Sequence, residues 1–88
     1  MKVTVRYFAR YRSLVGKGEE EVELPEGATV RDLIEKLREL HPVLKNEVFS
    51  EDDSFADVNV SRNGRYVGFD EILKEGDVVA LFPPVSGG

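Results

Sequence analysis

The sequence contains no cysteine and only one histidine among its 88 residues. The absence of cysteine excludes disulfides, thiolate nucleophiles, iron–sulfur clusters and cysteine-based zinc sites. With His41 alone, the chain also lacks a metal cage or proton relay built from several histidines. His41 precedes a proline at the predicted end of a helix, so we expect a partner of the helix dipole or a plain surface residue rather than a catalytic base.

Positive charge is scarce, because 12 Lys and Arg face 17 Asp and Glu, for a net charge of −5. Phosphate binding needs clustered Lys and Arg, so we expect no nucleic acid and no membrane surface as partner. No apolar run reaches the roughly 18 residues that span a bilayer, and the first residues lack the apolar segment of a signal peptide. We therefore expect a cytoplasmic protein. We also expect no bound metal, because the acidic residues 51–53 lack the spacing of a calcium loop.

Two segments near the start, residues 2–8 and 20–24, alternate in polarity and are predicted to be strands. In the first, Val3, Val5 and Tyr7 share one face, which leaves Phe8 on the other. Between the strands, residues 9–15 are predicted to form a short helical turn.

One long helix is predicted after Thr29, a good N-cap with Asp32 three residues on. Its apolar residues recur at helical spacing and are expected to face inward: Val30, Leu33, Ile34, Leu37 and Leu40. The step from His41 to Pro42 ends the helix, because the residue before a proline avoids the α region.

The second half of the chain begins with an irregular acidic stretch over residues 45–57, which Val48, Phe49 and Phe55 are expected to anchor. Asn63-Gly64 then indicates a type I′ hairpin. Residues 69–74 are predicted to form one helical turn, and residues 78–82 a buried central strand. One helix and about five strands in this order predict an α+β fold with a mixed sheet, as in the β-grasp fold.

The end of the sequence is the best candidate for chemistry. A Pro-Pro step follows the last strand, and Gly87-Gly88 close the chain. Residues 83–88 could reach about 20 Å and enter a narrow enzyme channel. The reactive group would be the α-carboxylate of Gly88, which is ionised at neutral pH and needs activation before a nucleophile attacks it. We expect a domain over residues 1–82 and a tail over residues 83–88. A frayed end or a cloning scar explains Gly-Gly alone, but not the preceding Phe-Pro-Pro-Val.

Exposed aromatic side chains form a second candidate site. If Val3, Val5 and Tyr7 face the helix, then alternation puts Phe8 on the opposite face of the sheet, and Phe82 with it. Together with Tyr66 they would form an uncovered aromatic patch of the kind that marks a protein interface. The alternative is that these rings close the edge of the core.

The sequence closely resembles the MoaD family of ubiquitin-like sulfur carriers, the small subunits of molybdopterin synthase and relatives of the ThiS proteins. The resemblance spans nearly the whole chain. Its segments are residues 7–16, residues 24–30, Gly68-Phe69-Asp70 and residues 75–88, which end in Phe-Pro-Pro-Val-Ser-Gly-Gly. The last of these is highly specific.

The resemblance implies a ubiquitin-like β-grasp fold and a role as a protein cosubstrate. A ubiquitin-activating-like (MoeB-like) enzyme would use ATP to adenylate Gly88, and a sulfur donor would convert the adenylate to a thiocarboxylate. The carrier, with no permanently bound cofactor, would then donate sulfur for the molybdopterin dithiolene on the large (MoaE-like) subunit, as a non-catalytic subunit of that transferase. The tail residues that would thread into these enzymes are Pro83, Pro84, Val85, Ser86 and Gly87.

The same resemblance assigns docking residues. Phe8, Tyr66 and Phe82 align with the family's hydrophobic docking face, and Arg12 aligns with a charged contact. Three other functions stay open. The chain could be a sulfur carrier for tRNA thiolation or thiamine synthesis, although Phe-Pro-Pro-Val favours the MoaD type over the thiamine type. It could be a ubiquitin-like modifier conjugated through Gly88. It could also be an interaction module that is never activated.

Overall fold

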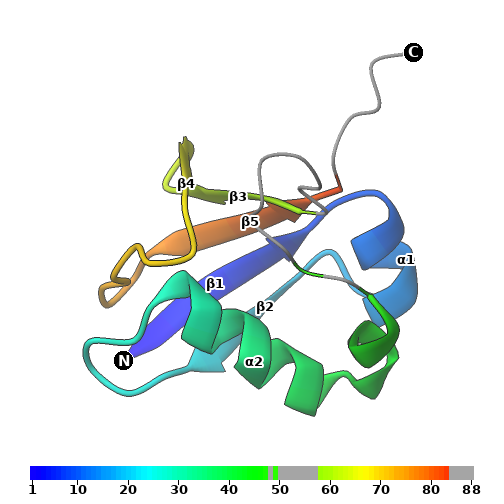
Figure 1. The fold of residues 1–88 in the computed structure, drawn as a ribbon, viewed down its shortest axis with the longest axis horizontal. Helices are drawn as coiled ribbons and strands as arrows, with labels where there is room; N and C mark the ends of the chain where they lie inside the picture. The colour runs from blue at the N-terminus through cyan, green and yellow to red at the C-terminus, as the bar shows by residue number, and fades with distance from the viewer. Residues whose placement is uncertain (48, 50–57, 84–88) are drawn as a thin grey trace.

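The computed structural model describes residues 1–47, 49 and 58–83 of the chain (Figure 1). Over these residues the chain forms five strands, two α-helices and a 3-10 helix. In chain order the elements are β1 (Lys2–Tyr7), α1 (Arg10–Val15), β2 (Glu19–Glu23), α2 (Val30–Leu40), η1 (Pro42–Asn46), β3 (Asn59–Arg62), β4 (Arg65–Val67) and β5 (Val78–Phe82).

The strands of the described residues form one mixed sheet in the order β2-β1-β5-β3-β4. The last strand, β5, therefore lies at the centre, parallel to β1 and antiparallel to β3. A strand with neighbours on both sides and a helix over one face needs apolar residues along most of its length. The predicted central strand and the predicted mixed sheet with one main helix are both confirmed.

The main helix, α2, lies across one face of the sheet (Figure 1). It begins at the predicted cap, where the Thr29 side chain accepts a hydrogen bond from the backbone N–H of Asp32. The Asp32 carboxylate in return accepts one from the backbone N–H of Thr29 at 2.9 Å. This reciprocal capping box satisfies two N–H groups that a helix start otherwise leaves unpaired. The helix ends at Leu40, before the His41-Pro42 step, as predicted.

The core fills the space between α2 and the sheet. The predicted inward residues of β1, Val3, Val5 and Tyr7, are each at most 1% exposed. They pack in one cluster with Val79 and Leu81 of β5 and with the buried residues of α2, namely Val30, Leu33, Ile34 and Leu37. Alternation along the strands thus assigned the two faces of the sheet correctly.

The predicted hairpin is also confirmed. Asn63 and Gly64 have φ values of 52° and 87°, the pair of positive angles that a type I′ turn requires. The turn joins β3 to β4 with Arg62 opposite Arg65 and Ser61 opposite Tyr66. This register carries Tyr66 to the same face of the sheet as Ser61.

The prediction that Leu40 is buried with the other apolar residues of α2 is wrong, since it is 47% exposed. Leu40 is the last residue of the helix, and the chain turns at Pro42 into η1, an element that the sequence did not predict. Leu44 of η1 is 1% exposed, so it occupies the core at this end of the helix.

The predicted helical turn over residues 69–74 is also wrong. The chain makes a turn at Phe69 and Asp70, and Ile72 then pairs with Thr29 in an isolated antiparallel bridge. The carbonyls of Phe69 and Glu71 accept hydrogen bonds from the backbone N–H groups of Arg31 and Val30, each at 3.0 Å. An extended segment here satisfies the first turn of α2, which a helical segment could not do with carbonyls bonded internally.

Candidate functional site

The predicted tail leaves the sheet at the end of its central strand. Phe82 is the last residue of β5, and Pro83, half-buried, follows it directly. The remaining predicted tail residues lie outside the described residues: Pro84, Val85, Ser86, Gly87 and the proposed reactive residue Gly88. The structure therefore describes the point at which the tail is attached and its surroundings.

Three aromatic side chains surround this exit, and we call Phe8, Tyr66 and Phe82 the aromatic cluster. The rings of Phe8 and Phe82 stack with centroids 4.5 Å apart and an interplanar angle of 15°. The ring of Tyr66 meets that of Phe82 edge-on, with centroids 6.3 Å apart. Phe82 is thus the central ring, and its position at the end of β5 places the cluster beside the tail exit.

Strand pairing explains why residues so far apart in sequence meet here. Parallel pairing of β1 with β5 puts Tyr7 beside Leu81, so the next residues, Phe8 and Phe82, are neighbours on the opposite face. The backbone N–H of Phe8 also donates to the carbonyl of Leu81 at 3.2 Å. Because Tyr7 and Leu81 are buried under α2, the cluster lies on the face of the sheet that α2 leaves uncovered.

The cluster is only partly a free patch. Tyr66 is 72% exposed, whereas Phe8 and Phe82 are half-buried because their rings cover each other. Beside the rings the floor of this face is made of small residues, since Ala80 and Ser61 pair with one another and are at most 9% exposed. The sequence left open an uncovered aromatic patch or rings that close the edge of the core. The structure lies between the two, because Tyr66 is uncovered and the two phenylalanines form a compact pair at the surface.

A cation that the sequence analysis did not single out adjoins the cluster. The guanidinium of Arg6 lies 5.6 Å from the ring centroid of Phe8 and 3.9 Å from the Glu19 carboxylate. A cation over an aromatic face is attracted by the ring quadrupole. The sequence could have predicted this contact, because alternation along β1 places Arg6 and Phe8 on the same face of the sheet. Arg12, the predicted charged contact, is exposed on α1, outside the aromatic cluster.

On the other face of the sheet, His41 is not a plain surface residue. It stands at the C-terminal end of α2, as predicted, but its side chain is 18% exposed and its Nε2 lies 2.5 Å from Oε2 of Glu20. The hydroxyl of Tyr7 donates to the same oxygen at 2.5 Å. The three side chains connect β1, β2 and the end of α2. The sequence did not predict their contact, because the three residues lie far apart in the chain.

The surroundings shift two pKa values in this group. Burial would raise the pKa of the Glu20 carboxyl, but hydrogen bonds from Tyr7 and His41 and the nearby charges of His41 and Lys17 hold it below its usual range. Burial and the neighbouring Glu20 raise the pKa of the Tyr7 hydroxyl. Glu20 therefore stays ionised and Tyr7 protonated at neutral pH, which suits a structural role.

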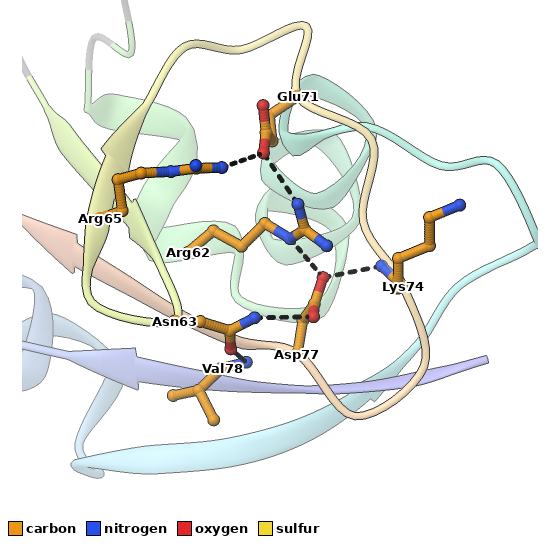
Figure 2. A network of polar contacts seen from close by, with 7 residues as sticks. All are labelled: Arg62, Asn63, Arg65, Glu71, Lys74, Asp77 and Val78. Atoms are coloured by element: carbon orange, nitrogen blue, oxygen red, sulfur yellow. Dashed lines mark hydrogen bonds and ion pairs between the residues drawn. The ribbon is translucent and has the colours of Figure 1, made fainter.

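A second polar network attaches the β3–β4 hairpin to the start of β5 (Figure 2). Asp77, which is 5% exposed, accepts hydrogen bonds from the Arg62 guanidinium at 2.6 Å and from the Asn63 side-chain amide at 2.9 Å. The backbone N–H of Lys74 donates to the same carboxylate at 2.7 Å. Burial alone would raise the pKa of Asp77, but these bonds and the charge of Arg62 lower it.

Within residues 1–47, 49 and 58–83, no three His, Cys, Asp or Glu side chains are grouped so that they could hold a metal ion. None of the helices in this part of the chain has the length and apolar character needed to cross a membrane.

The sequence is similar to a known protein family and to several of its members. The ThiS family profile matches residues 5–88. Small archaeal modifier protein 1 of Haloferax volcanii is 39% identical over 94% of this chain and 97% of its own length. The molybdopterin synthase sulfur carrier subunit of Chlamydomonas reinhardtii is 37% identical and covers both chains fully.

Two solved structures are also similar to this chain in both sequence and fold. One from Pyrococcus furiosus, described provisionally as subunit 1 of a molybdopterin converting factor, is 61% identical with a TM-score of 0.86, over 97% of this chain and 99% of that one. A chain of the BexX/CysO complex of Amycolatopsis orientalis is 32% identical with a TM-score of 0.72, over 98% and 99% of the two chains.

The ubiquitin of Caldiarchaeum subterraneum, 20% identical with a TM-score of 0.60 over 100% of this chain and 98% of its own, shares the fold. The fold is thus the ubiquitin-like β-grasp. Because the family profile and both relatives cover nearly the whole chain, it belongs to the ThiS family and is a sulfur carrier of the MoaD/ThiS type.

Proposed function

We propose that the chain is the sulfur-carrying small subunit of a molybdopterin synthase. Gly88 provides the carboxylate that is adenylated with ATP by a ubiquitin-activating-like enzyme and then converted to a thiocarboxylate. The large synthase subunit receives the sulfur for the molybdopterin dithiolene. The chain itself contributes a reactive terminus and a docking surface, and its partners contribute the catalytic side chains.

The observation that carries this proposal is the position of the tail exit. The central strand ends at Phe82, the middle ring of the aromatic cluster, and passes directly into Pro83. A partner that docks on the cluster therefore also receives the tail. A carboxylate tethered to a docked carrier reaches the partner's site at a high effective concentration, which lowers the entropic cost of the reaction.

The same surface supports the choice of partners. The rings of Phe8, Phe82 and Tyr66 offer apolar area, and Arg6 offers a charge at its margin. Aromatic residues and arginine are the types enriched at the centres of protein interfaces. A match at 37% identity to a molybdopterin synthase sulfur carrier subunit supports the large synthase subunit as one partner.

A second function has support of its own. The 39% identity to a small archaeal modifier protein favours conjugation of Gly88 to lysine side chains of target proteins. Carrier and modifier share the first step, adenylation of the terminal carboxylate, and differ in the nucleophile that follows. The docking surface and the tail exit serve either function.

Intact mass measurement after incubation with ATP, a sulfur source and a candidate activating enzyme tests the proposal. We expect one carboxylate oxygen of Gly88 to be replaced by sulfur, and the product to convert a pyranopterin precursor when the large subunit is added. Attachment to the lysine of another protein would instead establish the modifier. A chain that no activating enzyme changes, while it still binds partners through the sheet, would overturn both in favour of a passive interaction module.

A further inference from the structure

The turn between β3 and β4 has a chemical property apart from its role in the hairpin. The sequence has only three side-chain amides, Asn46, Asn59 and Asn63, and no glutamine. Only Asn63 is followed by glycine. Glycine has no side chain to hinder its own backbone nitrogen as a nucleophile, and Asn63 and Gly64 are both exposed, so water can reach this turn.

We propose that Asn63 is a modification site, at which the chain deamidates spontaneously and which the folded hairpin protects. In the reaction the backbone nitrogen of Gly64 attacks the side-chain carbonyl carbon of Asn63. The C–N bond of the side-chain amide breaks, and ammonia leaves with the proton of the Gly64 nitrogen. Water then opens the resulting succinimide to aspartate or isoaspartate, so the step needs no oxidant or reductant.

The fold opposes the first step because both ends of the Asn63 amide are held (Figure 2). Its Nδ2 donates to Oδ1 of Asp77 at 2.9 Å, and its Oδ1 accepts from the backbone N–H of Val78 at 2.9 Å. The backbone N–H of Asn63 also donates to the carbonyl of Val78 at 2.8 Å. The side-chain carbon cannot swing toward Gly64 until these bonds open. Deamidation therefore proceeds from locally opened hairpins, at a rate set by their population.

The product would damage the contact that now protects the residue. A carboxylate at position 63 would face the buried carboxylate of Asp77 where an amide donor stood, and like charges at this distance repel each other. Isoaspartate would also add a methylene to the main chain, which the two-residue turn between Arg62 and Arg65 cannot accommodate in the same register. Either product loosens the β3–β4 hairpin, whose second strand carries Tyr66, from the start of β5.

The first experiment compares the full chain with itself, folded and in guanidinium chloride, in the same mildly alkaline buffer. Fragment mass spectra report the exchange of amide for carboxyl at each asparagine over time. We expect Asn63 to react first in the denatured chain, and at least about tenfold more slowly in the folded one, as a local opening energy above 1.4 kcal/mol implies. Equal rates in the two states, or a faster reaction at Asn46 or Asn59, would overturn the proposal.

The second experiment measures what the product does, using Asn63→Asp and the chemically identical control Asn46→Asp in the exposed end of η1. We expect Asn63→Asp to lower the thermal midpoint by roughly 5–10 °C, and the control to lower it far less. The midpoint is measurable by circular dichroism even if the variant is only marginally folded. Equal midpoints for the two variants would show that the amide at position 63 does not hold the hairpin.

Discussion

The ring of Phe82 stacks on the ring of Phe8, with centroids 4.5 Å apart and planes inclined by 15°. One residue ends the central strand and the other follows the first strand, so their contact marks the place where the parallel pairing of β1 and β5 stops. The next residue after Phe82 is Pro83, the start of the tail. The aromatic cluster and the tail exit are therefore parts of one structure.

Replacing Phe82 by glutamate should weaken docking on the large synthase subunit by at least about tenfold. The charge would stand between the rings of Phe8 and Tyr66 and would be buried unpaired when a partner covers them. Titration calorimetry measures the affinity. Ile72→Glu is the matched control, because Ile72 is 50% exposed and pairs with Thr29 beside the start of α2. The same affinity for both variants would remove Phe82 from the interface.

Replacing Gly88 by alanine should leave folding unchanged and abolish thiocarboxylate formation. The last core residue is Leu81 and the sheet ends at Phe82, whereas a methyl group at residue 88 would crowd the channel in which the carboxylate is activated. Intact mass after incubation with ATP, sulfur source and activating enzyme gives the readout, with thermal midpoint and docking affinity as controls for folding. Normal sulfur loading of this variant would contradict the proposed mechanism.

Replacing Glu20 by glutamine should reduce stability at neutral pH and change its dependence on pH. The folded-state pKa of Glu20 lies below its ordinary value of 4.5, so its contribution is full above that pH and is lost as the pH falls through the folded pKa. Tyr7, His41 and Lys17 are the groups that face this carboxylate. We expect a loss of about 1–2 kcal/mol at pH 7 that shrinks toward zero in acid. Urea unfolding across this pH range measures it, and a pH-independent difference would contradict the ionic contribution.

Replacing Asp77 by alanine should cost much more stability than the same change at Asp70. Asp77 is buried and accepts hydrogen bonds from Arg62, Asn63 and the backbone N–H of Lys74, so its removal breaks three bonds to one buried carboxylate at a cost of about 2–4 kcal/mol. Asp70 forms an exposed ion pair with Arg31, and its side chain is 86% exposed, so its loss should cost less than about 1 kcal/mol. Denaturant midpoints compare the two, and similar values would contradict the role assigned to the network.

The elements with strong local signals were the ones that sequence analysis predicted well. Thr29 and Asp32 mark the start of α2 by a capping interaction between near neighbours, and Asn63-Gly64 specify their turn through backbone angles. The segment over residues 69–74 lacked such a signal. Its conformation depends on the N–H groups of Val30 and Arg31 at the start of α2, which have no partner within the helix and lie far from this segment in the sequence.

In the candidate site, too, local sequence patterns predicted some features and not others. Alternation along β1 and β5 placed Phe8 and Phe82 on one face, because the period of a strand is a local property. It did not determine whether the two rings touch, nor that Arg6 covers Phe8. The contact of His41 with Glu20 was missed for the same reason, since it joins the end of α2 to β2 across the core.

By itself, the sequence determined the periodicities, the caps and turns, and the Gly-Gly end with its Phe-Pro-Pro-Val approach. These depend on backbone sterics and short-range hydrogen bonds, which residue identity specifies directly. Only the tertiary structure decided that β5 lies between β1 and β3, and so that Phe82 stacks on Phe8 beside the tail exit. Strand order and ring contacts result from burying one shared core, whose contacts join distant parts of the chain and whose free energy belongs to the whole fold.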